Sequence, residues 1–339
     1  MVTAIRDADL LQLAGLTLQA GDQRGVTYEL GSVIGEGAHG VVFDAQRRAE
    51  SAENAESVAS AESATTRAVV KILRPRAVRE LGALASPIIA KEVAALRKLS
   101  QLAAKTPYVV AFLDAGAVQI ADSPLALPWI ALEFVEGGPD GVTLRVRVVN
   151  AIAATGNAFP LLRARSAAHC LTEGLVAIHD VGVIHRDLSP NNVLACGTAE
   201  DELFKISDFG LARVNSATTF GDVQLGTPGY CAPEQSFPEK AGIGPYTDVF
   251  GLACTVYFLL TGEPYFNARS IPETLVAVHQ PERRQILAAR SIDASLRGRP
   301  ALCVELDRIL AQATRANPTA RPQSARELGD QLRRALASA

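Results

Sequence analysis

The residues best suited to chemistry lie in two short segments near the middle of the chain. The first is Val183–Leu194, with the sequence VIHRDLSPNNVL, and the second is Lys205–Gly210, with the sequence KISDFG. Together they contain two carboxylates and one amide, on Asp187, Asp208 and Asn192. Phosphoryl transfer needs a carboxylate that accepts the proton of the attacking hydroxyl, and it needs oxygen ligands for magnesium. These two segments therefore favour a phosphoryl-transfer enzyme.

A glycine-rich segment near the N-terminus is a second candidate for phosphate chemistry. Gly35, Gly37 and Gly40 follow the pattern GxGxxG. The apolar runs Tyr28–Ile34 and Gly40–Ala45 predict two strands that this segment joins. Because glycine has no side chain, the backbone N–H groups of such a loop can approach phosphate oxygens. A plain glycine hairpin turn is the alternative interpretation.

A lysine and a glutamate complete the set of candidate groups. Lys71 lies in the apolar run Arg67–Leu73, which predicts a third strand, and Glu92 follows on a predicted helix over Ile88–Ser100. A lysine that faces an apolar interior needs a counter-charge, which Glu92 would provide. The pair would then direct the ammonium group toward phosphates. Two solvated charges are the alternative.

The elements that must position these groups fall into two parts. A strand-rich first third is followed, after Glu136, by segments with helical periodicity at Leu161–Val181, Asp248–Leu260 and Ala301–Ala316. This division predicts two lobes with a cleft between them. Residues 47–67 are rich in Ala, Glu and Ser, and they are interpreted as a solvated, largely disordered insertion between two strands.

Composition excludes several other classes of protein. Of the 339 residues, 48% are apolar and 20% are charged, which excludes a fully disordered chain. The net charge of −3 offers no basic field for nucleic acid. Five scattered cysteines favour reduced thiols in a cytoplasmic protein. The longest runs without charged residues, Val148–Leu162 and Val249–Gly262, are shorter than a membrane span of about 18–20 residues.

Taken in order along the chain, these motifs resemble those of the eukaryotic-type protein kinase family, especially the bacterial serine/threonine kinases. The resemblance extends through Gly226–Tyr230 (GTPGY), Ala232–Glu234 (APE), Asp248 on an apolar helix, and Arg321–Pro322. It covers residues 28–336. It implies an α+β, two-lobed protein kinase fold with a small β-rich N-lobe carrying one key helix, a larger α-helical C-lobe, and an ATP cleft between them.

The resemblance also implies domain boundaries. Residues 1–27 form an N-terminal extension, and residues 28–336 form the kinase domain. The N-lobe comprises residues 28–135 and the C-lobe residues 136–336.

The resemblance also implies an ATP site. Lys71 would hold the α- and β-phosphates, oriented by Glu92. Val42 and Leu194 would enclose the adenine, and Leu132 would be the gatekeeper in front of the hinge. The ATP-binding residues implied in this way are Ile34, Gly35, Glu36, Gly37, Ala38, His39, Gly40, Val42, Lys71, Leu132, Glu133, Val135 and Leu194.

Catalytic and metal-binding roles follow from the same resemblance. Asp187 would be the catalytic base, with Arg186 beside it, and Asn192 and Asp208 would ligate Mg²⁺. The substrates would be Ser/Thr hydroxyls of proteins. Three further residues would have structural roles: Glu234 and Arg321 as a buried ion pair that anchors the activation segment, and Asp248 as a brace under the catalytic loop.

The activation segment is expected to act as a switch. It contains Ser216, Thr218, Thr219 and Thr227. We expect autophosphorylation at the first three of these, and Arg186 is the type of residue that pairs with an added phosphate. Thr227 would instead serve the loop that docks the substrate.

Ser189 is the main departure from the family pattern, because kinases of this type usually carry a lysine there that contacts the γ-phosphate. Losing that charge should slow catalysis, although a serine hydroxyl can still donate a hydrogen bond to phosphate. Two alternatives to an active protein kinase therefore stay open. One is a pseudokinase that binds nucleotide or partners only. The other is a small-molecule phosphotransferase. Gly226–Glu234 disfavours it, because a segment of this sequence resembles one that docks peptide substrates.

Overall fold

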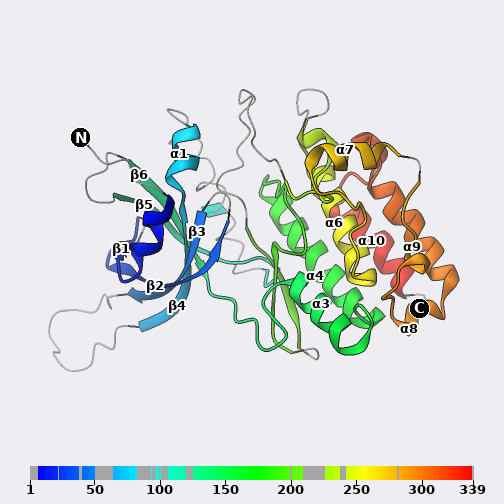
Figure 1. Cartoon of the computed structure of the whole chain (residues 1–339), viewed down its shortest axis with the longest axis horizontal. Coiled ribbons are helices and arrows are strands. Elements are labelled where there is room, and N and C mark those ends of the chain that lie inside the picture. Colours follow the sequence, from blue (N-terminus) through cyan, green and yellow to red (C-terminus); the bar gives the residue numbers. More distant parts are fainter. Residues whose placement is uncertain are drawn as a thin grey trace. The chain divides into compact units, whose positions relative to one another are not determined.

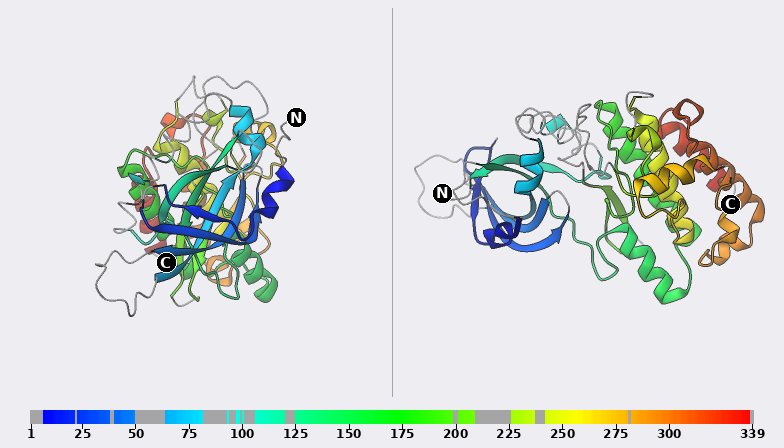
Figure 2. Two further views of the ribbon diagram at one scale, coloured as in Figure 1. Left: turned by 90° about the vertical axis from the view of Figure 1, so that its left-hand side faces the viewer. Right: turned by 45° about the horizontal axis from the view of Figure 1, so that its top comes forward.

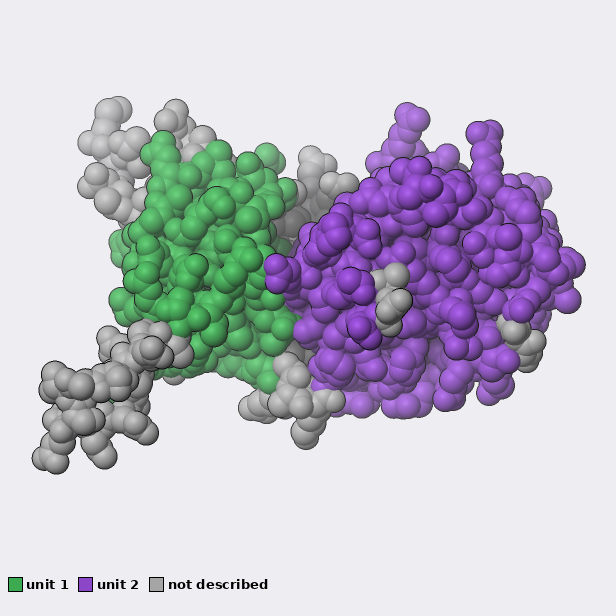
Figure 3. All heavy atoms as spheres, turned by 90° about the horizontal axis from the view of Figure 1, so that it is seen from below, with its two compact units in different colours: residues 1–103, 111–134, 211–214 green, residues 104–110, 135–210, 215–339 purple. Residues whose placement is uncertain are grey.

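The computed structural model divides into two compact units (Figures 1 and 3), one rich in strands and one rich in helices, as the sequence predicts. Unit 1 comprises residues 1–103, 111–134 and 211–214, and unit 2 comprises residues 104–110, 135–210 and 215–339. The residues that the structure describes are 7–21, 23–37, 40–49, 64–81, 93, 97–98, 100, 106–119, 125–198, 201–208, 226–236, 242–280 and 282–337.

Within the described part of unit 1, the strands form one antiparallel sheet in the order β1-β2-β3-β4-β6-β5. A short helix, α1 (Pro75–Leu81), follows β4. Burial alternates along β2 and β3 because successive side chains of a strand point to opposite faces of the sheet. The strands are β1 (Thr17–Gln19), β2 (Val26–Glu36), β3 (Gly40–Ala49), β4 (Ala64–Leu73), β5 (Phe112–Gln119) and β6 (Ala126–Glu133).

Large apolar and aromatic side chains fill one face of this sheet. Tyr28, Phe43, Ile72 and Trp129 are almost completely buried, and the rings of Tyr28 and Trp129 lie 5.6 Å apart. Gly116 on β5 lets the indole approach the backbone, since a Cβ at that position would lie 2.6 Å from Cζ2 of Trp129. The core of unit 1 is therefore formed by close packing around one tryptophan.

Residues in front of Tyr28 also contribute to this unit. A 3₁₀ helix, η1 (Asp7–Leu13), precedes β1, which pairs with β2 at the sheet edge. Leu10 and Leu18 are buried, and the N–H of Gly15 donates to the carbonyl of Leu30 at 2.7 Å. The segment interpreted as an N-terminal extension thus packs on the sheet over its described residues.

The Ala/Glu/Ser-rich segment 47–67 differs at both ends from the solvated insertion that its composition predicts. β3 continues to Ala49 and β4 begins at Ala64, and these two residues are partners in the ladder. Backbone pairing and the Arg48–Glu29 ion pair at 2.6 Å extend the hairpin into sequence that has little apolar surface. Residues 50–63 lie outside the described part of the chain.

Unit 2 is built around α6 (Pro245–Thr261), which is buried on all sides from Thr247 onward. The helices α4 (Leu161–Asp180), α9 (Pro300–Ala313) and α10 (Ala325–Ala337) pack against it (Figures 1 and 2). α4, α6 and α9 correspond to the three long helices that the periodicity predicts.

Unit 2 also contains several shorter elements among its described residues. They are α3 (Leu144–Thr155), α7 (Ile271–His279), α8 (Ala294–Arg297), the hairpin of β7 (Val193–Cys196) and β8 (Leu203–Ile206), and the 3₁₀ helices η3 (Pro233–Gln235), η4 (Ile286–Ala288) and η5 (Pro318–Ala320). All five cysteines are free thiols. Among the described helices, none combines the length and the apolar character needed to cross a bilayer.

Candidate active site

The carboxylate of Asp187 is held on both of its oxygens. Oδ1 accepts hydrogen bonds from the backbone N–H and the hydroxyl of Thr227, both at 2.8 Å. Oδ2 accepts from Nδ2 of Asn192 at 2.7 Å. The side chain is therefore fixed between the predicted catalytic loop, Val183–Leu194, and the GTPGY segment, and the residue is 8% exposed.

The β7–β8 hairpin brings Asn192 and Asp208 to the same end of one short ladder. Val193 pairs with Ile206, and the carbonyl of Asn192 accepts from the N–H and the hydroxyl of Ser207 at 2.9 and 3.0 Å. Asp208 follows directly, with a left-handed φ of 57°. Within the described residues, only Asp208 and Arg186 combine a side chain with positive φ. Such a backbone conformation is common at functional sites; Arg186 belongs to the predicted catalytic residues and Asp208 to the predicted metal ligands.

Asp248, on α6, braces the catalytic loop from inside the unit. Its Oδ1 accepts from the N–H of Arg186 at 2.6 Å, and its Oδ2 accepts from the N–H of His185 at 2.8 Å. Nε2 of His179 on α4 lies 2.8 Å from Oδ2. Burial alone would raise the pKa of Asp248, but the hydrogen bond and charge of His179, the charge of His185 and the backbone N–H of Arg186 together lower it. The carboxylate is therefore held ionised inside the protein.

Glu234 and Arg321 form the buried ion pair that the resemblance implies. Two parallel hydrogen bonds join them at 2.8 and 2.9 Å, and both side chains are almost fully enclosed. The hydroxyl of Thr247 donates to Oε1 of Glu234 at 2.9 Å, and Arg321 also donates to three backbone carbonyls. Such complete hydrogen bonding is what a buried ion pair requires.

The glycine-rich segment is the tip of the β2–β3 hairpin. Gly35 pairs with Val42, and the N–H of Gly37 donates to the carbonyl of Gly40 at 2.9 Å. A Cβ on Gly40 would lie 2.8 Å from the carbonyl oxygen of Ile72, so the neighbouring β4 strand requires glycine at this position. Packing against β4 is thus one reason for glycine at position 40, and the predicted phosphate binding is a second one.

The other residues of the predicted ATP set divide between the two units. In unit 1, Lys71 is half-buried on β4 between Val42 and Ile130 of the neighbouring strands, and Oε1 of Glu133 accepts from the N–H of Ala111 at 2.9 Å. Also in unit 1 are Ile34, Glu36 and Leu132; Val135 and Leu194 belong to unit 2. The predicted site residues outside the described part of the chain are Ala38, His39, Glu92, Ser216, Thr218 and Thr219.

Ser189, which stands in the place of the usual lysine, has an enclosed side chain in this structure. Its side chain is fully buried, and its Oγ makes no hydrogen bond within the described part of the chain. The N–H of Asn192 donates to the carbonyl of Ser189 at 3.0 Å, and this hydrogen bond closes a turn over residues 189–192. The carbonyl of this residue therefore takes part in the turn, while its hydroxyl is enclosed by protein.

Motif reasoning missed several residues that hold the site together. Besides His179, they include Gln235, whose Nε2 donates to the carbonyl of Arg186 at 2.7 Å. Another is Arg147 on α3, a buried arginine that pairs with Glu202 and donates to the carbonyl of Ala195 at 3.2 Å. The partners named here (Asp248, the carbonyl of Arg186 and the carbonyl of Ala195) are 48 to 69 positions away in the chain, so no local pattern indicates these contacts.

Comparison with known proteins agrees with this geometry. The family described as "Protein kinase domain" matches residues 28–331. Calcium/calmodulin-dependent protein kinase type 1B of Rattus norvegicus is 32% identical over 249 residues, which are 73% of this chain and 60% of that protein. Serine/threonine-protein kinase PknB of Mycobacterium tuberculosis is 33% identical over 227 residues, which are 66% of this chain and 32% of that protein.

The fold also matches a solved structure. The kinase domain of Mycobacterium tuberculosis PknI superposes with a TM-score of 0.59 at 21% identity, covering 94% of this chain and 99% of that domain. The chain spans about 60% of the length of the calmodulin-dependent relatives and about a third of PknB. On the match to residues 28–331 and on the identity to these kinases, the chain belongs to the protein kinase domain family.

Proposed function

We propose that this chain is a protein serine/threonine kinase, which transfers the γ-phosphate of ATP to Ser or Thr hydroxyls of protein substrates. The observation that carries the proposal is the fixed carboxylate of Asp187, bonded by Asn192 on one side and by Thr227 of the GTPGY segment on the other. A base linked in this way to a peptide-docking segment suits an acceptor hydroxyl that is presented on a polypeptide.

Each group would have one task. Asp187 would orient the acceptor hydroxyl and take up its proton, and Lys71 would hold the α- and β-phosphates with the help of Glu92. Asn192 and Asp208 carry the oxygen donors that Mg²⁺ prefers and lie at one end of the β7–β8 hairpin, so the donor set fits this ion. When bound, Mg²⁺ would neutralise charge on the phosphates. Asp248 would keep the loop in shape through its bonds to His185 and Arg186.

Regulation by autophosphorylation is part of the proposal. Arg186 sits next to the proposed base with a positive φ, and its guanidinium is the type of group that pairs with a phosphate, here one on Ser216, Thr218 or Thr219. The bond between Thr227 and Asp187 supports a docking role for that threonine. Mass spectrometry after incubation with ATP and magnesium would test this part, and an activation segment without phosphate would contradict it.

One observation favours a second candidate, a pseudokinase. The residue in the place of the usual γ-phosphate lysine is Ser189, and its hydroxyl is buried. An enzyme without that contact loses electrostatic stabilisation of the transition state, which is worth about 10²–10³ in rate for one such group. The base, the metal ligands and Lys71 all remain, and we therefore favour slow catalysis over none.

The deciding experiment uses labelled ATP, magnesium and a generic protein acceptor, with Asp187→Asn as the matched control. Transfer by the wild type and none by the variant would support the kinase. Binding of a fluorescent ATP analogue without any transfer, even after phosphorylation of the activation segment by another kinase, would favour the pseudokinase. Transfer to small hydroxyl compounds alone would identify a small-molecule phosphotransferase.

A further inference from the structure

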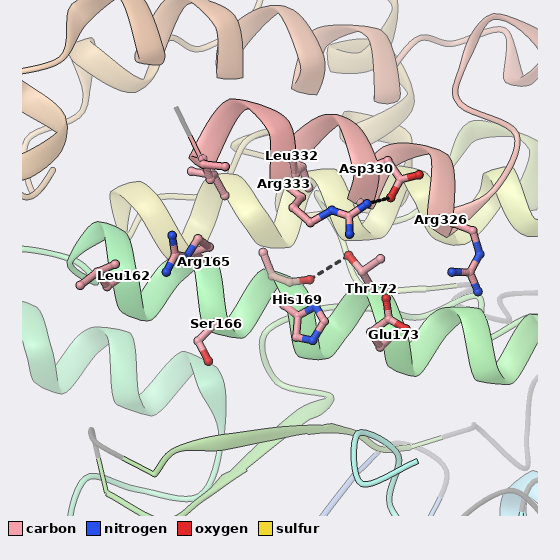
Figure 4. Close-up of a pocket in the computed structure, with 14 residues that line it drawn as sticks. Leu162, Arg165, Ser166, His169, Thr172, Glu173, Arg326, Asp330, Leu332 and Arg333 are labelled. Atoms are coloured by element: carbon pink, nitrogen blue, oxygen red, sulfur yellow. Dashed lines mark hydrogen bonds and ion pairs between the residues drawn. The ribbon is translucent and has the colours of Figure 1, made fainter. Parts of the chain in front are cut away.

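A cavity of about 440 Å³ lies in unit 2, between α4 and α10 (Figure 4). One face of each helix lines it, with residues spaced three or four apart, as neighbours on a helix surface are. The two helices touch at Gly329, where a Cβ would lie 2.2 Å from Cγ2 of Thr172. Cavities of a few hundred Å³ are of the size that holds small organic ligands. None of the predicted catalytic residues lines this one.

Much of the cavity wall is apolar. Ala168, Leu332 and Leu336 contribute to its lining and are themselves almost fully buried, so they form a firm wall. Leu162, at one end of the cavity, is 68% exposed and leaves apolar surface open to a ligand.

The charges around the cavity are unevenly distributed (Figure 4). Toward one end, Arg326 and Glu173 both line the wall, and Arg333 pairs with Asp330 at 2.6 Å. Toward the other end is Arg165, which makes no ion pair within the described part of the chain, and no carboxylate lines the wall there. His169 follows Arg165 by one helical turn and faces the same space. The end of the cavity that is richest in leucine therefore has an unmatched positive charge.

We propose that this cavity binds a small amphiphile with an apolar body and one anionic head group, a carboxylate or a phosphate. The body would lie against Leu332 and Leu336, and the head group would accept hydrogen bonds from the guanidinium of Arg165 and from the ring of His169. Arginine suits this task because its planar group of donors matches both carboxylate and phosphate oxygens. The inference is independent of catalytic activity, because the cavity and its lining residues lie outside the candidate active site.

The test measures binding to the full chain by isothermal titration calorimetry. Decanoate and decyl phosphate are the anionic probes, and decanol is the neutral one. We expect one molecule of an anionic probe per chain, binding at least tenfold more tightly than decanol. The stronger of the two anions identifies the preferred head group. Arg165→Glu should weaken anion binding at least tenfold, whereas Arg165→Lys should retain part of it.

The matched control is Arg334→Glu, which makes the same charge change on an exposed residue of α10 outside the cavity lining. It should leave binding unchanged, and thermal melting should show that all variants are folded. The proposal is wrong if neither anion binds the wild type, if decanol binds as well, or if Arg165→Glu and Arg334→Glu behave alike. It is also wrong if the anions fail to bind and Arg165→Glu dissociates a dimer, since the cavity would then be an interface between two copies.

Discussion

The sheet of unit 1 and the loop region of unit 2 are stabilised in different ways. In unit 1, apolar side chains such as Phe43 and Trp129 pack against one face of a sheet of hydrogen-bonded strands. In unit 2, the catalytic loop is held by buried charged groups, notably Asp248 and the Glu234–Arg321 pair. In the sheet, the cost of a substitution depends on how much apolar side chain it removes from the packed core. The loop region depends on a few polar groups, and removing one of them leaves its partner buried and unsatisfied.

The largest expected effect is on chemistry at the loop. Asp187→Asn removes the proton acceptor but keeps a side chain of the same shape, so we expect phosphoryl transfer to fall by about 10²–10⁴-fold. Lys71→Met should abolish transfer, since it removes the proposed phosphate clamp. Initial rates with labelled ATP measure both effects, and circular dichroism should show folded variants. Near-normal turnover by Asp187→Asn would contradict the assignment of the base.

The second effect is on stability, again in unit 2. Arg321→Met leaves the carboxylate of Glu234 buried without its cation, and breaking a buried pair in this way typically costs about 3–5 kcal/mol. Chemical denaturation should therefore show a large loss in the free energy of unfolding. The double variant Arg321→Met/Glu234→Met should recover part of the loss, because it leaves no unpaired charge. A single variant as stable as the wild type would show that the pair does not anchor this region.

A matched change in unit 1 acts through packing alone. Leu10 is fully buried ahead of the first strand, and truncating such a leucine to alanine typically costs about 2–5 kcal/mol. Leu10→Ala should lower the melting temperature, while Leu11→Ala, at a position 44% exposed, should have little effect. Equal behaviour of the two variants would mean that residues 7–21 are not part of the core of unit 1.

The pH dependence of stability distinguishes the two regions further. The pKa of Asp248 is lowered in the folded state, so the unfolded chain binds more protons at this site. Its contribution is fully present above the ordinary aspartate pKa of about 3.9 and is lost as the pH falls through the lower folded value. Asp248→Asn should therefore be less stable than the wild type at neutral pH, with a shallower loss of stability below about pH 4. Denaturation curves of both proteins that stay parallel down to pH 2 would contradict this.

The same contrast explains what could be predicted from the sequence. The strands β2, β3 and β4 and the long helices α4, α6 and α9 follow from apolar periodicity, which reports directly on burial. The candidate site was found through its motif, because HRDLSPNN and DFG combine residues that rarely occur together. Neither periodicity nor motifs indicate the roles of His179 and Gln235. Their partners, Asp248 and the carbonyl of Arg186, lie far away in the chain. The burial of the Ser189 side chain could not be predicted either, because it depends on the three-dimensional path of the loop.

Ser189→Ala is expected to have the smallest effect of all and to be the most informative about the loop. The hydroxyl is fully enclosed and makes no hydrogen bond within the described residues, so burying it costs desolvation energy that no partner offsets. Alanine keeps the Cβ and the backbone, including the carbonyl that accepts from Asn192. Stability should therefore stay the same or rise by up to about 1 kcal/mol, and turnover with saturating ATP should change less than twofold. Ser189→Lys is the paired measurement, because it restores the charge that the family usually has there. If Ser189→Ala loses tenfold or more in turnover while remaining folded, the hydroxyl reaches the substrate after all, and the loop must open during the reaction.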